Sequence, residues 1–279
     1  GLATGLVDLD EEMWGLPWGT ITLVAARPGM GKTTLLTQMA ESIAASPHNS
    51  DTLVLFFSLE MTAIQLVQRM AGSASGIPIR RLRTLQAWQS EGEKRLLKQA
   101  VDQIAALPFL IDETPGLTPG RFAAEVRRIQ RENKGKKIVA MIDYVQQMQA
   151  DERSVRSAYD RATAISQGLT RATKELGIVT IAAAQLNRAS ESRGGNRPTM
   201  ADLRDSGQWE QDAAAILFPH RPSYYDQDRV GSKAIEIDAE IIVGKGRFSG
   251  NSVIPMHFNP TCARYLVPGS YQQGGRNDF

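Results

Sequence analysis

The segment around Lys32 carries the residues whose types and spacing most clearly indicate chemistry. Backbone N–H groups bind phosphate oxygens best where no side chain intervenes, and glycines at the start of a helix give that access. In such a loop Lys32 can reach the β- and γ-phosphates, and the Thr33 hydroxyl can ligate Mg²⁺. The sequence therefore predicts a phosphate loop that binds a nucleoside triphosphate. Its expected contacts are Arg27, Pro28, Gly29, Met30, Gly31, Lys32, Thr33 and Thr34.

Two carboxylates and one amide lie at or just after the ends of other apolar runs. If those runs are parallel strands, their carboxyl ends meet at the edge of the sheet where α/β proteins bind ligands. Asp143 is then the expected Mg²⁺ carboxylate, Glu60 the base that activates the attacking water, and Gln185 the sensor of the γ-phosphate. From the residues alone, a turn cap, a solvated glutamate and a strand-edge amide are the respective alternatives.

Short apolar runs alternate with segments of helical periodicity along most of the chain. This alternation predicts an α/β fold with right-handed crossovers, a mostly parallel twisted sheet and helices on both faces. Several early runs are apolar throughout, as in strands that are covered on both faces. Less helix separates the later runs, so we expect antiparallel strands at one end. The expected strands are 20–26, 52–58, 108–112, 138–143, 178–184, 213–218, 238–243 and 253–258.

Local patterns also indicate where several helices begin. Thr62 with Gln65 forms a capping-box pattern, and Thr118 can cap a helix that has Pro119 in its first turn. Apolar residues repeat every three or four positions over 155–176, which predicts one long helix with a single apolar stripe.

Length and composition exclude several classes of protein. A chain of 279 residues can bury a large core without disulfides or metals, and we expect one domain over 1–268 and a flexible tail over 269–279. The single cysteine, Cys262, excludes an internal disulfide framework and fits a reducing compartment. No apolar run approaches the ~20 residues of a membrane span, so we expect a cytoplasmic protein without a membrane partner. The formal net charge of +2 means that nucleic-acid binding would need a local basic patch.

Such a patch is present in the polar, glycine-containing segment 186–204. Positive loops follow a phosphate backbone without reading bases, which gives salt-dependent, sequence-tolerant binding. The segment has no aromatic residue, so base stacking is not expected to carry the binding. From composition alone, an ordinary solvated loop is the simpler interpretation. Its arginines are Arg188, Arg193, Arg197 and Arg204.

Five segments, taken in order, resemble the motifs of the RecA-like motor domain of the DnaB family of hexameric replicative helicases. They are AARPGMGKTT, FSLEM, MIDYVQQM, AAAQLNR and RPTMADLRDSGQWEQDA. The resemblance runs from about Thr4 to Leu266. It implies a RecA-like P-loop NTPase that hydrolyses ATP with Mg²⁺ at the subunit interfaces of a homohexameric ring. It also implies 5′→3′ movement on single-stranded DNA, unwinding of duplex at the replication fork, and a primase and a helicase loader as partners.

The resemblance assigns roles to individual residues. Glu60 matches the catalytic glutamate, Asp143 the Walker B aspartate and Gln185 the γ-phosphate sensor. Lys245 and Arg247 match a basic pair that enters the ATP site of the neighbouring subunit, although the following Phe-Ser-Gly departs from the stretch that is usual in the family.

The segment 202–207 matches the loop that holds the single strand in the central channel. Its expected contacts are Arg204, Asp205 and Gly207, and the family usually has glutamate where Asp205 stands. The helical N-terminal domain and linker helix of the family have no counterpart here, so we expect either a truncated chain or a naturally short relative. Two other functions stay open: a filament-forming strand-exchange ATPase, and a ring or loader that uses ATP only as a switch.

Overall fold

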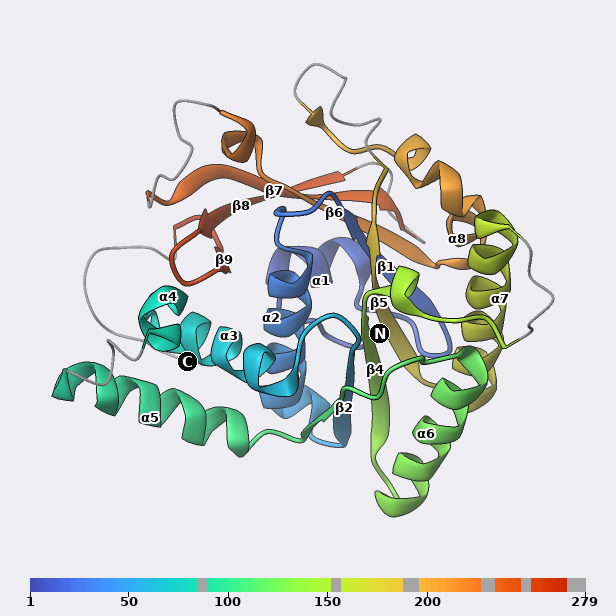
Figure 1. Cartoon of the computed structure of the whole chain (residues 1–279), viewed down its shortest axis with the longest axis horizontal. Helices are drawn as coiled ribbons and strands as arrows, with labels where there is room; N and C mark the ends of the chain where they lie inside the picture. The colour runs from blue at the N-terminus through green and yellow to red at the C-terminus, as the bar shows by residue number, and fades with distance from the viewer. Residues whose placement is uncertain (85–89, 152–156, 188–195, 227–233, 247–251, 270–279) are drawn as a thin grey trace.

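A mixed β-sheet forms the centre of the computed structural model, which describes residues 1–84, 90–151, 157–187, 196–226, 234–246 and 252–269 (Figure 1). Within these residues the strand order is β3-β2-β4-β5-β1-β6-β7-β8-β9. The strands from β3 to β6 pair in parallel, whereas β6, β7, β8 and β9 pair antiparallel. The α/β fold with antiparallel strands at one end, as expected from the sequence, is therefore confirmed.

The strand bounds follow the apolar runs closely. They are β1 (Ile21–Ala26), β2 (Thr52–Ser58), β3 (Phe109–Asp112), β4 (Lys137–Asp143), β5 (Val179–Gln185), β6 (Ala215–His220), β7 (Glu236–Lys245), β8 (Ser252–Asn259) and β9 (Arg264–Leu266). Strands β1 and β2 are buried along their whole length, as are β4 after its first residue and β5 before its last. This is the burial that a parallel sheet with two covered faces requires.

Helices cover both faces of the sheet (Figure 1). One buried cluster joins the sheet to α1, α2, α3 and α5, and a second joins its other face to α6, α7 and α8. The α-helices are α1 (Val7–Met13), α2 (Lys32–Ala45), α3 (Ala63–Ser75), α4 (Ile79–Arg83), α5 (Glu91–Ala105), α6 (Pro119–Glu132), α7 (Ala158–Leu176) and α8 (Gly207–Asp212). Short 3₁₀ segments are η1 (Pro47–Asn49), η3 (Val145–Gln147), η6 (Met200–Ser206) and η7 (Pro222–Tyr225).

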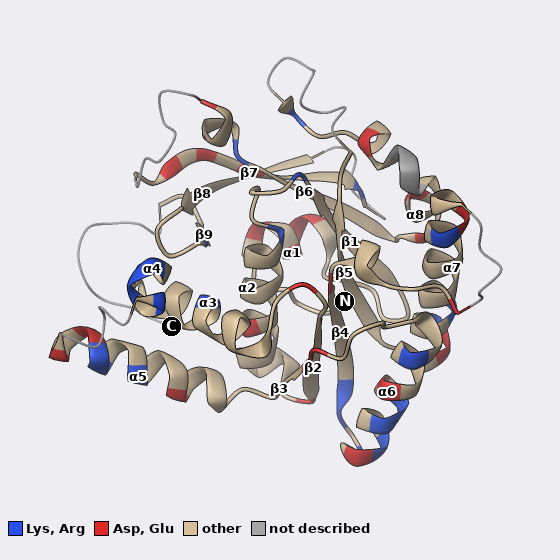
Figure 2. Ribbon diagram, in the orientation of Figure 1, with Lys and Arg blue, Asp and Glu red and all other residues tan. Residues whose placement is uncertain are grey.

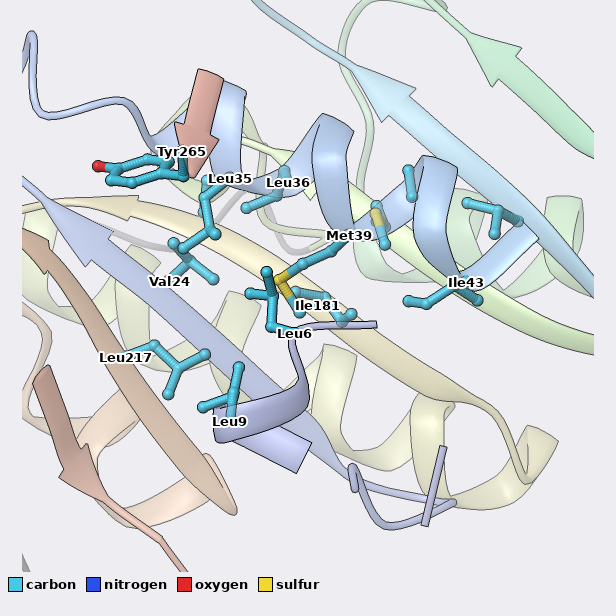
Figure 3. Packing of buried hydrophobic residues seen from close by; sticks show 14 of the residues in the cluster. Leu6, Leu9, Val24, Leu35, Leu36, Met39, Ile43, Ile181, Leu217 and Tyr265 are labelled. Atoms are coloured by element: carbon cyan, nitrogen blue, oxygen red, sulfur yellow. The ribbon is translucent and has the colours of Figure 1, made fainter. Parts of the chain in front are cut away.

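Helix α2, which follows the phosphate loop, is anchored by its apolar face. Leu35, Met39 and Ile43 recur at helical spacing and are fully buried. Figure 3 shows them above the sheet, where Val24 and Ile181 come from neighbouring strands. Because this stripe fixes the axis of α2, it also fixes the position of the residues at its N-terminus.

The two predicted helix caps are confirmed, whereas the expected long helix begins later than predicted, because Ser157 is its N-cap. The Thr62 side chain accepts a hydrogen bond from the Gln65 backbone and the box is reciprocal, while Thr118 accepts from the Arg121 backbone. Helix α7 begins at Ala158, later than the expected 155, and residues 152–156 lie outside the described part of the chain. The expected tail also lies outside it from residue 270. Among the described residues, no helix combines the length and apolarity that crossing a bilayer requires.

Candidate nucleotide-binding site

The carboxyl ends of four parallel strands converge on one edge of the sheet. Ser58 of β2 is level with Asp143 of β4, and Ala26 of β1 is level with Gln185 of β5. The phosphate loop leaves β1 at this edge and enters α2 at Lys32. Strand register thus brings the phosphate loop, Asp143, Gln185 and the turn that carries Glu60 to the same edge of the sheet.

The phosphate loop adopts a backbone that depends on its two glycines. Gly29 has φ of 84° and Gly31 has φ of 90°, in the left-handed region that other residues rarely adopt. Gly31 is the N-cap of α2, so the first free N–H groups of the helix follow directly after it. The Met30 amide closes the turn by donating to the Arg27 carbonyl at 3.3 Å.

Arg27 does not extend into solvent from this loop. Its Nη1 donates to the carbonyl oxygen of Leu186 at 2.8 Å, and the Leu186 amide donates to the Ala26 carbonyl at 3.1 Å. These two contacts join the loop to the segment that follows Gln185.

Thr33 and Asp143 form the centre of the site. The Thr33 hydroxyl donates to Asp143 Oδ2 at 2.7 Å, and Asp143 is only 1% exposed. Burial raises the pKa of Asp143, while the Thr33 hydrogen bond and the nearby Lys32 oppose that rise. Within the described residues, Asp143 Oδ1 is buried without a hydrogen-bond partner. A hydroxyl beside a carboxylate with a spare oxygen is a donor set that suits Mg²⁺.

Lys32 lies close to two carboxylates at this edge. Burial lowers the pKa of Lys32, the charges of Asp143 and Glu60 raise it, and Arg27 lowers it further. Its Nζ lies 5.8 Å from the centroid of the Tyr144 ring. Bound phosphate oxygens would replace the hydration that burial removes from this ammonium.

Two hydrogen bonds hold the turn after β2 that carries Glu60. The Leu59 amide donates to the Asp143 carbonyl at 2.9 Å, and the Ser58 hydroxyl donates to the Met61 carbonyl at 2.6 Å. Glu60 itself is exposed, yet its charge acts on both Lys32 and Asp143. An exposed carboxylate in this position can meet a water molecule beside a bound phosphate.

Arg69, on α3, belongs to the same group of charges and is not predicted by the sequence motifs. Burial lowers the pKa of Arg69, and the charges of Asp143 and Glu60 raise it. Its Nε is buried and, within the described residues, lacks a hydrogen-bond partner. The sequence signal for Arg69 is weak, because one arginine on an amphipathic helix normally lies in solvent.

Gln185 ends β5 with an exposed side chain and a fixed backbone. The Gln146 side chain accepts from the Gln185 amide and donates to the Gln185 carbonyl, both at 3.1 Å. A cavity of about 310 Å³ begins here and extends toward η6, lined among others by Arg161, Asn187 and Trp209. The cavity therefore joins the edge that holds Gln185 to the segment that was expected to hold DNA.

That segment is only partly described. Arg188, Arg193 and the side chains of Arg204 and Asp205 lie outside the described part of the chain. Arg197 is exposed and forms an ion pair with Glu240 at 3.3 Å.

The backbone around the expected DNA segment is held by local contacts. Thr199 is the N-cap of η6, and the Asp202 carboxylate accepts hydrogen bonds from its amide and its hydroxyl, at 2.8 and 3.1 Å. Gly207 is the first residue of α8, which the buried Trp209 anchors. Figure 2 shows a further basic group, on α4, on the opposite side of the molecule from α8.

The predicted basic pair is also divided between described and undescribed residues. Lys245 is the last residue of β7 rather than a residue beyond it, because pairing with Ile216 extends the strand past the apolar run. Its Nζ donates to the carbonyls of Glu210 at 2.7 Å and Gln211 at 3.3 Å, near the end of α8. Arg247 lies outside the described residues.

Strand order, the glycine-dependent loop between β1 and α2, and the Thr33–Asp143 contact define a RecA-like P-loop nucleotide-binding domain. The family model described as DnaB-like helicase C terminal domain matches residues 1–266. The chain belongs to this family. Membership implies that the chain uses a nucleotide.

Relatives and solved structures agree with that assignment. The chain is 38% identical over 266 residues to the replicative DNA helicase DnaB of Haemophilus influenzae, a match that covers 95% of this chain and 55% of the relative. It is 35% identical over 237 residues to DnaB of Geobacillus stearothermophilus, covering 85% of this chain and 51% of the relative. The chain thus spans about half the length of these curated relatives.

Two solved structures share the fold at a TM-score of 0.87. One of them, described as an ATPase domain, is 29% identical, with 96% of this chain and 91% of that chain covered. The other, a DnaB-like replicative helicase solved in a study of its interactions with primase, is 30% identical, with 96% of this chain and 62% of that chain covered.

Proposed function

We propose that the chain is the motor domain of a hexameric replicative DNA helicase, which hydrolyses Mg·ATP and moves 5′→3′ along single-stranded DNA. The observation that carries the proposal is the hydrogen bond between Thr33 and the buried Asp143, beside Lys32 and within electrostatic reach of Glu60. Family membership supports the helicase activity, since the matched relatives are replicative helicases. The activity of the longer relatives is thereby extended to this chain as a hypothesis.

Each residue of the site would have a separate role in hydrolysis. When bound, Mg²⁺ neutralises charge on the phosphate oxygens, and Thr33 Oγ1 with the Asp143 carboxylate would hold it. Lys32 places a desolvated positive charge beside the β- and γ-phosphates. Both effects act where negative charge grows during transfer, so they stabilise the transition state more than the ground state.

Glu60 would serve as the base. As the water oxygen bonds to the γ-phosphorus, the bond from that phosphorus to the oxygen of the leaving ADP breaks and the water proton passes to the Glu60 carboxylate. Gln185 would orient that water or the γ-phosphate through its side-chain amide. Loss of the γ-phosphate would then change the contacts of Gln185, which lines the cavity that extends to η6.

The partners follow from the same assignment. Single-stranded DNA would contact the arginines of the segment 186–204 and Gly207 at the start of α8, mainly through phosphates. Lys245 and Arg247 would complete the nucleotide site of an adjacent subunit, so the active form would be a ring of identical chains. A primase is a further proposed partner, because a similar helicase was solved in a study of that interaction.

Steady-state ATPase assays with and without single-stranded DNA test the proposal. Lys32→Ala should abolish hydrolysis by removing the charge beside the phosphates, and Lys94→Ala, which removes a half-buried lysine of α5, should leave it unchanged. DNA should stimulate the intact chain. Hydrolysis that persists in Lys32→Ala would overturn the assignment of the site.

Measurements of assembly mass and of ATP turnover distinguish the helicase from the two alternative functions. With a non-hydrolysable ATP analogue and single-stranded DNA, the helicase hypothesis requires a closed hexamer, whereas a strand-exchange ATPase would give an open filament of growing mass. An ATP-switched ring would bind nucleotide and assemble but would show no DNA-stimulated turnover.

A further inference from the structure

The rear of the phosphate loop is held by residues from the antiparallel end of the sheet. Arg221, which follows β6, donates from Nη1 to the carbonyl oxygen of Gly29 at 2.5 Å. The Tyr265 hydroxyl, on β9, donates to the carbonyl oxygen of Met30. Both donors are enclosed, with Arg221 6% exposed and Tyr265 2% exposed. Two successive carbonyls of the loop therefore each have a dedicated side-chain donor.

Arg221 is itself held rigidly. Its Nε and Nη2 contact the two carboxylate oxygens of Glu236 at 2.7 and 2.6 Å, a bidentate pair that fixes the plane of the guanidinium. The guanidinium carbon lies 3.8 Å from the centroid of the Phe258 ring. A charged donor fixed in this way can aim at a single carbonyl, as a flexible surface arginine could not.

Aromatic rings fill the remaining space behind the loop. A Cβ atom on Gly31 would meet the Tyr265 ring at 3.1 Å and the Phe258 ring at 3.3 Å, and one on Gly29 would collide with the Tyr224 hydroxyl. Figure 3 shows the Tyr265 ring beside Leu35 of α2, at the edge of the core. The loop is therefore packed from behind at Gly31, where phosphate would approach from the other side.

The direction of the carbonyls determines the direction of the N–H groups. In a trans peptide the carbonyl and the following N–H point in opposite directions. Holding the Gly29 carbonyl from behind turns the Met30 amide inward, where it donates to the Arg27 carbonyl at 3.3 Å. Holding the Met30 carbonyl from behind turns the Gly31 amide away from Tyr265, toward the open side of the loop.

We infer that Arg221 and Tyr265 are positioning residues of the nucleotide site, which orient the peptide groups of the phosphate loop before nucleotide arrives. The inference rests on the proposed function, because it takes the loop as the phosphate site. Glu236 and Phe258 act one step further away by holding Arg221. The antiparallel strands β6 to β9 thus contribute to nucleotide binding without touching the nucleotide.

Tyr265→Phe tests the inference with the smallest change, since it removes only the hydroxyl and leaves the packed ring. If the hydroxyl orients the loop, part of the population leaves the binding geometry and the apparent affinity falls by the fraction lost. One hydrogen bond of this kind corresponds to about a 3- to 10-fold weaker Kd. The measurement is titration with a fluorescent ADP analogue, with and without Mg²⁺, together with the Tm of each variant.

Two controls separate positioning from general stability. Ile254→Val, in the buried part of β8, should lower Tm without weakening nucleotide binding, because Ile254 contacts the core and not the loop carbonyls. Tyr159→Phe removes a hydroxyl from an exposed residue of α7 and should change neither quantity. Arg221→Lys keeps the charge but loses the bidentate fork, and should weaken binding at least as much as Tyr265→Phe.

Unchanged nucleotide affinity in both Tyr265→Phe and Arg221→Lys would overturn the inference while leaving the proposed function intact. An affinity loss in Ile254→Val of the same size as in Tyr265→Phe would also overturn it, since stability alone would then explain the effect. Failure of the unmodified chain to bind the nucleotide at all would overturn the inference and the proposed function together.

Discussion

The Gln146 side chain hydrogen-bonds both backbone groups of Gln185, at 3.1 Å in each direction. Strands β4 and β5 pair as far as Ile142 and Ala182. Three residues further along β5, the Gln146 side chain takes the place of a strand partner for Gln185. On its other side Gln185 is level with Ala26 of β1. The backbone of the expected γ-phosphate sensor is therefore held from both sides while its side chain is exposed.

Gln146→Glu tests whether this contact positions Gln185. A carboxylate keeps the acceptor for the Gln185 amide but presents a lone pair to the Gln185 carbonyl, so one hydrogen bond becomes a repulsion. We expect kcat for ATP to fall by roughly 10- to 100-fold, as small misplacements of catalytic groups do, with nucleotide affinity almost unchanged. Gln147→Glu introduces the same charge one residue later and should leave kcat close to normal. Equal effects in the two variants would contradict the prediction.

Glu60→Gln should separate binding from turnover. The amide cannot accept a proton from water, whereas the loop and Lys32 are untouched, so nucleotide should bind normally and hydrolysis should fall by about 10²- to 10⁴-fold. Glu11→Gln is the matched control, since Glu11 is an exposed carboxylate on α1. Near-normal turnover of Glu60→Gln in a steady-state ATPase assay would remove Glu60 from the mechanism.

Arg197→Ala and Arg204→Ala should each weaken single-stranded DNA binding about equally for every sequence. Each loss of a phosphate contact should also reduce the slope of log K against log salt by a little under one. Fluorescence anisotropy with labelled oligonucleotides of several sequences, at several salt concentrations, measures both effects. An effect confined to particular sequences would indicate base readout and contradict the assignment of the segment.

Much of the fold, and the placement of Glu60 and Asp143 at one edge of the sheet, could be predicted because the sequence patterns involved are local. Strand β2 coincides with the expected run 52–58, since uninterrupted apolar residues bounded by polar ones define a buried strand. The caps at Thr62 and Thr118 were recognisable because a cap lies within three residues of its partner. Parallel register brings Glu60 and Asp143 to the same edge, which follows once Asp143 is placed at the end of one strand and Glu60 just after the end of its neighbour.

The contacts that hold the carbonyls of the phosphate loop could not be predicted, because they join residues far apart in the sequence. Arg221 is 192 residues from Gly29 in the sequence, and Tyr265 is 235 residues from Met30. The start of β7 could not be predicted either, because Glu236 interrupts the apolar pattern of the strand. Its burial is explained by the ion pair with Arg221, which the sequence does not show. Strand β9 has three residues, too few to show a period.

Glu41 should make the stability of the chain depend on pH. Burial raises the pKa of Glu41 from about 4.5 to about 7, partly offset by Arg264. Between these values the folded state holds a proton that the unfolded state has lost, so the free energy of unfolding should fall as pH rises from about 4.5 to 7. Glu41→Gln should remove that slope and be more stable at pH 8 by about 1 to 3 kcal/mol. Urea denaturation at several pH values measures it, with the exposed Glu11→Gln as control, and an unchanged slope in Glu41→Gln would contradict the prediction.

Lys245 offers the sharpest test of the ring. In this chain its ammonium group binds the Glu210 and Gln211 carbonyls near the end of α8, where a cation is favoured by the unpaired carbonyls of a helix end. The proposed function instead requires Lys245 and Arg247 to reach the nucleotide of a neighbouring subunit, where finger arginines elsewhere contribute roughly 10³- to 10⁵-fold in rate. A role within its own chain and a role in the neighbour make opposite predictions when defective subunits are mixed.

Lys245→Ala and Lys32→Ala should each have very low ATPase activity when alone. If Lys245 acts in the neighbour, some mixed interfaces will combine an intact phosphate loop from one subunit with an intact Lys245 from the other, and activity will reappear in the mixture. If Lys245 instead only stabilises α8, Lys245→Ala alone should keep substantial ATPase activity. Native mass spectrometry of the mixture must show that the two kinds of subunit share rings. Mixed rings as inactive as their parents would mean that Lys245 does not complete the neighbouring site, and the interface placed at the end of β7 would be wrong.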